Sequence, residues 1–217
     1  MPAALEPIDT VADLIRRLGD IPPERILWNP IPGTATEADA LRLNDGEPKR
    51  LVELIDGILV EKAMGFPESF LASWIATCLN NFVIPRRLGI VGGADLLVRV
   101  LGTQVRLTDV SYFPWSSIPN AAELREPIGR IAQAIAVEVV SPSNTKREIE
   151  RKRAEFFSSG TFLFWIVDPK NETVLVYTDA LTFHVLTTAD TLDGGRVLPG
   201  FSLKIADLFG YLDFPSE

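Results

Sequence analysis

The chain has 217 residues, 47% of them hydrophobic and 23% charged, which is typical of a globular domain with a sizeable core. A formal net charge of −8 disfavours avid, non-specific binding to nucleic acid, because phosphate contacts supply most of such affinity. One cysteine and one histidine exclude an internal disulfide and a zinc site built from Cys and His, so chemistry here would use carboxylates, lysine and a hard metal ion.

Residues 1–50 are predicted to form an N-terminal extension, and residues 51–217 the main domain. Helical spacing of apolar residues predicts a short helix over Thr10–Leu18. Four prolines then interrupt regular structure, so we expect loop and extended chain over Ile21–Glu47. No apolar run approaches the roughly 18 residues that cross a bilayer, and the N-terminal stretch lacks an apolar signal core. We therefore expect a cytoplasmic protein without membrane association.

A hairpin and a long helix open the main domain. Two strand-like runs, LVELI and ILVEK, flank Asp56-Gly57, which is a strong signature of a tight hairpin turn. A helix is predicted to begin at Pro67 and to bury one stripe of ESFLASWIATCLNNFV. Cys78 lies in that stripe, so we interpret it as a core residue and not as a reactive thiol.

Strands are predicted in the middle of the chain over Asp95–Val100, Thr103–Phe113 and Ala134–Val140. A capping box at Thr145 and a closing Gly160 predict a second helix over Thr145–Ser159. FLFWIVD and TVLVYT read as a further strand pair, and FHVLTT as another strand. His184 lies in that last run, and we interpret it as a strand residue and not as a catalytic base.

Glu138 is the carboxylate of an otherwise apolar strand. The run AIAVEVV is apolar on both parities, as in a central strand covered on both faces. Burying an ionised carboxylate alone is costly, so Glu138 must be paired, protonated or bound to a cation. Ser141-Pro142 ends the strand and places Glu138 near its C-terminal edge, where ligand sites of α/β sheets gather.

Asp109 is the second candidate. It shares the parity of Val105 and Leu107, so it occupies a position that the alternation reserves for an apolar side chain. An acid at a strand end, exposed to water, is an equal alternative on position alone.

Lys152 is the third candidate. It shares the apolar stripe of the second helix with Ile149 and Phe156, and an inward lysine needs a negative partner, for which Glu138 is the nearest candidate. The alternative is a lysine whose stem passes apolar neighbours to reach water.

Two carboxylates and a lysine suit phosphodiester hydrolysis. Asp109 and Glu138 would hold a hard ion such as Mg²⁺, which lowers the pKa of bound water and neutralises phosphate charge. Lys152 would orient or deprotonate the water, or stabilise developing negative charge. The same helix carries Lys146, Arg147, Arg151 and Arg153, although such a run is more often a solvated face.

At these residues the chain resembles the Uma-two family of endonucleases, within the PD-(D/E)XK nuclease superfamily. The matching stretches span about Leu51 to Phe209, and they are LVELIDGILVEKAMG, VRLTDVSYF, AVEVVSPSNTKREIERKRAEFFSSGTFLFWIVDP and TLDGGRVLPGFSLKIADLF. EVVSPSN followed by RKRAEFFSSG and WIVDP is quite specific. Family members usually have proline before the aspartate, where this chain has Thr108, so local strand geometry is expected to differ.

The resemblance implies an α/β restriction-endonuclease-like fold, with a central mixed sheet flanked by helices, and Mg²⁺- or Mn²⁺-dependent DNA cleavage. It puts the family's aspartate on Asp109 and its glutamate on Glu138, with the carbonyl of Val139 and Glu68 as further metal ligands. The usual E-x-K lysine would fall at the apolar Val140, and Lys152 takes its place. Related nucleases often pair to cut two strands, so a homodimer is expected, with weak or transient DNA binding.

Two other functions remain open. A catalytically silent nuclease fold could act as a nucleic-acid-binding or regulatory module, since fold alone does not establish function. A glycosidase using Asp109 and Glu138 is the second, but it gives Lys152 no task.

Overall fold

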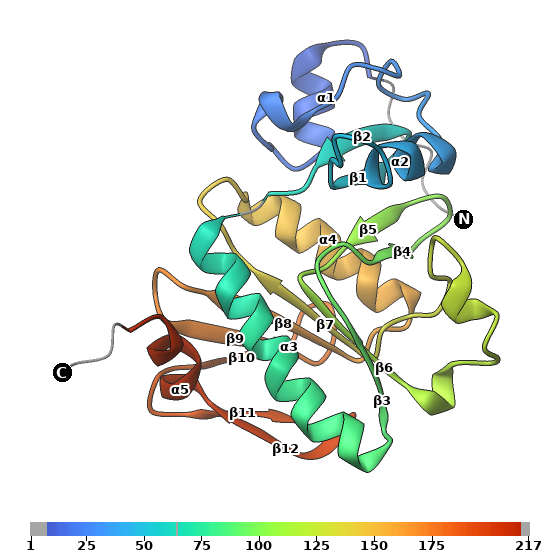
Figure 1. The fold of residues 1–217 in the computed structure, drawn as a ribbon. Helices are drawn as coiled ribbons and strands as arrows, with labels where there is room; N and C mark the ends of the chain where they lie inside the picture. The colour runs from blue at the N-terminus through green and yellow to red at the C-terminus, as the bar shows by residue number, and fades with distance from the viewer. Residues whose placement is uncertain (1–7, 64, 214–217) are drawn as a thin grey trace.

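The computed structural model describes residues 8–63 and 65–213, which fold into a mixed α/β structure (Figure 1). The central sheet has six strands in the order β10-β9-β8-β7-β6-β3. Their bounds are Gly89–Gly92 (β3), Val110–Pro114 (β6), Ile135–Val139 (β7), Leu163–Asp168 (β8), Thr173–Tyr177 (β9) and Phe183–Leu186 (β10). β7 and β8 are parallel and the other neighbours antiparallel, so the sheet is mixed, as predicted. His184 lies in the edge strand β10, as expected.

Two helices cover the central sheet, one on each face (Figure 1). α3 (Phe66–Arg86) lies on one face, where Ile75 packs in the same core cluster as Val137. α4 (Lys146–Ser159) covers the other face, where Phe156 packs with Ala136. Since both faces are covered, β7 is apolar on both parities. α4 also supplies the crossover that the parallel pair β7 and β8 requires.

The predicted ends of α4 are confirmed. Thr145 is the N-cap and forms a capping box with Glu148, and Gly160 ends the helix in the left-handed region with φ of 109°. In α3, Pro67 lies in the first turn as predicted, and Cys78 packs, partly buried, against the core. Phe70 departs from the predicted stripe, because 42% of it is exposed.

A second sheet has four strands in the order β2-β1-β5-β4. Their bounds are Val52–Ile55 (β1), Ile58–Glu61 (β2), Leu97–Arg99 (β4) and Val105–Leu107 (β5). The predicted hairpin is present: Ile55 pairs with Ile58, and the turn residues Asp56 and Gly57 have φ of 51° and 74°. The predicted strand from Asp95 to Val100 is present in its centre, as β4.

The described part of residues 1–50 packs on this hairpin. α1 (Val11–Arg17) confirms the first predicted helix, and Leu14 packs in one cluster with Ile58. The expectation of loop over Ile21–Glu47 is wrong in part, because η1 (Pro23–Arg25) and α2 (Glu37–Asn44) lie there. α2 begins with a capping box from Thr36 to Asp39, a signal that the proline-based argument overlooked.

The predicted strand Thr103–Phe113 is in fact two strands in two sheets. β5 belongs to the four-stranded sheet and β6 to the central sheet, with Thr108 and Asp109 between them. The alternation through Asp109 therefore does not hold, since the chain changes partners at this point and the N–H of Asp109 donates to the carbonyl of Val137.

The C-terminal part forms a small separate sheet and closes the core. β11 (Thr191–Gly194) pairs with β12 (Leu198–Lys204), followed by α5 (Ile205–Phe209) and η4 (Gly210–Leu212). Short 3₁₀ turns η2 (Trp115–Ser117) and η3 (Glu123–Arg125) lie in the connection between β6 and β7. Across the described ranges, no helix combines the length and the apolar character that a membrane span needs.

Candidate active site

Asp109 is fixed against the strand that carries Glu138. Its N–H donates to the carbonyl of Val137 at 2.9 Å, and its Oδ2 accepts from the N–H of Val139 at 2.7 Å. Glu138 lies between those two residues in β7 and is 5% exposed. Of the two interpretations of Asp109, the structure supports an acid at a strand end. Its side chain is only 13% exposed, however, because it contacts Lys62 and the N–H of Val139.

Lys152 makes the contact with Glu138 that its helical position predicts. Its Nζ lies 2.7 Å from Oε1 of Glu138 and 2.9 Å from Oε1 of Glu53, a residue of β1. It also donates to the carbonyl of Leu107. These three oxygens surround the ammonium of Lys152, whose side chain is buried, with 5% of it exposed.

Glu53 belongs to a buried chain of alternating charges that the sequence analysis missed. Its Oε2 lies 2.8 Å from Nη1 of Arg106, whose Nη2 lies 2.6 Å from Glu155. Arg151 continues the chain, at 2.8 Å from Glu155 and 2.9 Å from Asp56 in the hairpin turn. The site is therefore coupled by ion pairs to the hairpin and to α4.

Burial and neighbouring charges set the protonation of these groups. Burial raises the pKa of Glu138 to about 7, against the attraction of Lys152, and the charge of Asp109 acts in the same direction as burial. Burial opposes the charge of Lys152, but Glu138 and Glu53 outweigh it and raise its pKa. Glu53 is also desolvated, yet Lys152 and Arg106 hold its pKa far below the usual range. Lys152 therefore remains a cation, while Glu138 titrates near neutrality.

A cavity of about 290 Å³ brings three of the sequence-predicted residues together: Glu68, Asp109 and Val139 line it. Glu68 lies in the first turn of α3, and its Oε2 is buried without a hydrogen-bond partner among the described residues. Its carboxylate lies over Gly65, where an added Cβ would stand 1.8 Å from Oε2. Glu138 does not line this cavity, because its carboxylate lies on the α4 side of β7 with Lys152.

The oxygen ligands at this site fit a hard divalent ion that is held by few protein groups. They are carboxylate and carbonyl oxygens, and Mg²⁺ is usually held by one or two carboxylates with water completing its shell. Residues 8–63 and 65–213 contain no group of three His, Cys, Asp or Glu that could hold a metal ion by themselves. An ion here would therefore depend on few protein ligands.

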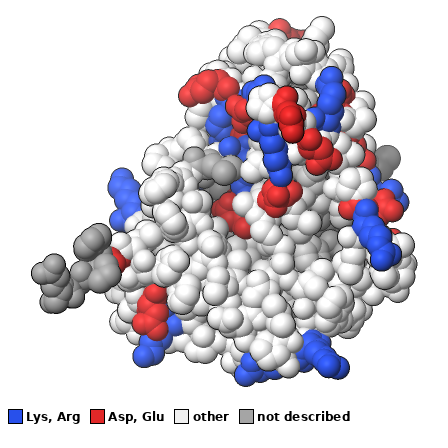
Figure 2. Space-filling model, viewed as in Figure 1, with Lys and Arg blue, Asp and Glu red and all other residues white. Residues whose placement is uncertain are grey.

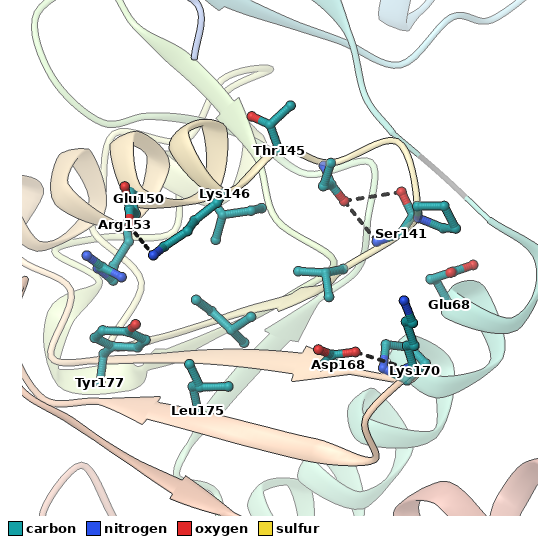
Figure 3. Close-up of a pocket in the computed structure, with 16 residues that line it drawn as sticks. Glu68, Ser141, Thr145, Lys146, Glu150, Arg153, Asp168, Lys170, Leu175 and Tyr177 are labelled. Carbon is teal, nitrogen blue, oxygen red and sulfur yellow. Dashed lines mark hydrogen bonds and ion pairs between the residues drawn. The ribbon is translucent and has the colours of Figure 1, made fainter. Parts of the chain in front are cut away.

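A larger cavity of about 680 Å³ lies beyond Glu68, between α4 and the ends of β8 and β9 (Figure 3). Its apolar lining includes Ile149 and Leu175, while Arg153 lies over the ring of Tyr177 at 4.1 Å. Figure 3 shows Lys170 and Glu68 at the end of the cavity away from Tyr177. Glu68 lines both cavities, so they are neighbours.

The positive run on α4 is largely neutralised. Arg147 pairs with Asp20 at 2.7 Å, and Lys146 lies 3.8 Å from Glu150. Arg151 is bound into the buried charge chain described above. On the face shown in Figure 2, charged side chains gather over the N-terminal region and the hairpin, and the surface over α3 is mostly uncharged. This agrees with the expectation that binding to nucleic acid is not driven by a broad basic surface.

Lys62, which the sequence analysis did not single out, is a further charged group of the site. Its side chain is 4% exposed, and its Nζ lies 2.8 Å from Oδ1 of Asp109. It follows β2 and continues the parity of the buried Ile58 and Val60, which is a signal that could have found it.

No curated protein matches the chain. A crystal structure from Anabaena variabilis ATCC 29413, described as "a putative nuclease belonging to DUF820", is similar, with 26% sequence identity and a TM-score of 0.70. The likeness covers 81% of this chain and 98% of that one, and it supports the restriction-endonuclease-like fold. Residues 37–206 match the Uma2 family, described as "Putative restriction endonuclease". Because that match covers most of the sequence, the chain belongs to the Uma2 family.

Proposed function

We propose that the chain is a nuclease that hydrolyses phosphodiester bonds of DNA with Mg²⁺ or Mn²⁺. The family and the structural neighbour support nuclease function in general. The finer proposal rests on one observation: Asp109 is hydrogen-bonded to β7, the strand that carries Glu138, and Lys152 lies 2.7 Å from Glu138. A glycosidase would have no use for that lysine.

Asp109 and Glu138 would hold the ion, with the carbonyl of Val139 as a further ligand. Glu68 would be a further ligand of the ion at the rim of the cavity, directly or through a water molecule. When bound, the ion supplies Lewis acidity at the phosphate and lowers the pKa of water. Hydrolysis forms a bond from the water oxygen to phosphorus and breaks one bond from phosphorus to an ester oxygen. The products are a phosphate monoester and a free hydroxyl, with the water protons shared between the leaving oxygen and the solvent.

Lys152 assists as a positioning residue in this proposal. Its ammonium contacts oxygens of Glu138, Glu53 and Leu107, and its raised pKa makes it a poor base. It orients the carboxylate of Glu138 and favours its ionised form. We therefore propose an electrostatic role for Lys152, and not the deprotonation of water.

The test is cleavage of plasmid and of single-stranded DNA with Mg²⁺ or Mn²⁺ by the wild type, Asp109→Asn and Lys152→Met. Lys204→Met, at an exposed position of β12, is the matched control. We expect cleavage by the wild type and the control, and loss of about 100-fold or more in the two site variants. Cleavage by all four proteins alike would contradict the site, and cleavage by none would favour the silent binding or regulatory module.

Other parts of the proposal follow from the same site. The DNA complex is proposed to be weak or transient, because the formal net charge is −8 and the basic residues of α4 are mostly paired. A homodimer is proposed as the way to cut two strands, and residues 51–217 as the nuclease domain. Sedimentation of the free protein and of its complex with a short duplex tests the dimer.

A further inference from the structure

Resting on the proposed nuclease function, we infer that Lys62 is the lysine that contacts the substrate phosphate, and that Asp109 holds it in place until an ion binds. The two lysines of the site differ in how many oxygens their ammonium groups contact. Lys152 has three oxygen partners, whereas Lys62 has two among the described residues, Oδ1 of Asp109 at 2.8 Å and the carbonyl of Ala94 at 3.2 Å. With two oxygen contacts in the described part of the chain, the three-donor ammonium of Lys62 can accommodate a further oxygen from an anion.

The side chain of Lys62 is 4% exposed while it pairs with Asp109, so contact with substrate requires its release from that carboxylate. Lys62 lies between two hollows of the surface, because its partners Asp109 and Ala94 line the cavity of about 290 Å³ while Lys62 itself lines a wider one of about 680 Å³ beside the hairpin. The wider cavity also carries Lys49 and Arg50, which pair with Asp95 at 3.0 Å and with Glu61 at 2.7 Å.

The partner of Lys62 is a ligand of the proposed ion. Asp109 offers two oxygens, and one already accepts from the N–H of Val139. The oxygen that faces Lys62 is therefore the one that an ion would have to share or take. An ion held there would weaken the pairing of Lys62 with Asp109, and the ammonium of Lys62 could then pair with a substrate phosphate.

The experiment compares Lys62→Met, Lys62→Arg and Lys204→Met in two binding assays that need no cleavage. Calorimetry with Mn²⁺ and no DNA measures the ion alone. Binding of a short DNA duplex in Ca²⁺ measures the phosphate contact. We expect Lys62→Met to bind Mn²⁺ more tightly than the wild type, because a competing cation is gone, and to bind DNA about tenfold or more weakly. Lys62→Arg should recover most of the DNA affinity, and Lys204→Met should match the wild type.

This pair of opposite effects separates a substrate contact from a structural ion pair. A lysine that only neutralises Asp109 would leave DNA affinity unchanged once Ca²⁺ is bound, and that result would overturn the inference. Unfolding temperatures of all variants show whether Lys62→Met is folded, and Lys62→Gln replaces it if it is not. If the wild type itself neither binds Mn²⁺ nor cuts DNA, the proposed function fails. If the wild type does both and Lys62→Met equals it, only the role of Lys62 fails.

Discussion

Asp109 accepts a hydrogen bond from the N–H of Val139 at 2.7 Å, so the acid that follows β5 is tied to the backbone of β7. This bond sets the spacing between the two proposed ion ligands, since Glu138 precedes Val139 on the same strand. It also leaves one oxygen of Asp109 for a cation, at present the ammonium of Lys62.

Asp109→Asn should abolish stabilisation by divalent ions. An ion that binds only the folded state at 100 times its dissociation constant adds about 2.7 kcal/mol, which for a chain of this size raises the unfolding temperature by about 5–10 °C. We expect that rise with Mn²⁺ in the wild type and in the exposed control Asp45→Asn, and none in Asp109→Asn. Thermal unfolding with and without Mn²⁺ measures it. An equal rise in all three proteins would place the ion elsewhere.

Lys152→Met should strongly destabilise the ion-free protein. The substitution preserves volume but leaves the buried carboxylates of Glu138 and Glu53 facing each other without their shared cation. Breaking a buried ion pair from one side costs about 3–5 kcal/mol. Urea unfolding measures the free energy, with Lys204→Met expected within about 0.5 kcal/mol of the wild type. A loss below about 1 kcal/mol for Lys152→Met would show that pairing with Glu138 and Glu53 contributes little to stability.

Glu138→Gln should change how stability depends on pH. The pKa of Glu138 is about 7 in the folded protein against an ordinary 4.5, so between these values the folded state holds a proton that the unfolded state has lost. Stability of the ion-free wild type therefore falls as pH rises through this window, by up to about 3 kcal/mol. Glu138→Gln lacks this component, so its stability relative to the wild type should increase from pH 5 to pH 8. Urea unfolding at both pH values checks the sign, and a constant difference would contradict it.

Glu53→Gln and Arg106→Met should be strongly non-additive. Each variant breaks the buried contact at 2.8 Å, and each leaves other members of the charge chain unpaired. Residues in direct contact show coupling energies of about 0.5–3 kcal/mol, so the double variant should lose less than the sum of the two single losses. A double-mutant cycle from urea unfolding measures the coupling. Simple additivity would mean that the two charges do not depend on one another.

The main elements could be predicted because each has a strong local signature. The turn Asp56-Gly57 and the cap at Thr145 form between near neighbours, and the apolar run around Glu138 marks a strand covered on both faces. The contact between Lys152 and Glu138 followed from the cost of burying either charge alone. These are rules that a single sequence can express.

What could not be predicted depends on contacts between distant segments. The division of Thr103–Phe113 into β5 and β6 arises because Asp109 bonds to β7, some thirty positions later, and no local pattern marks that exchange. Glu53 and Arg106 could have been found by the argument applied to Glu138, since each is a charge in an apolar strand run. Their pairing with Glu155 could not, because that requires the helix and the second sheet to be placed together.

Lys152 reaches Glu138 from α4, so no lysine is needed two residues after Glu138 on the strand. That position holds Val140, which lines the cavity between α4 and the ends of β8 and β9. A search that requires glutamate and lysine at fixed separation along one strand would pass over this chain, although the two groups meet in space. Recognition of such enzymes from sequence therefore has to ask which charges are forced inward on separate elements, and whether they can neutralise one another there.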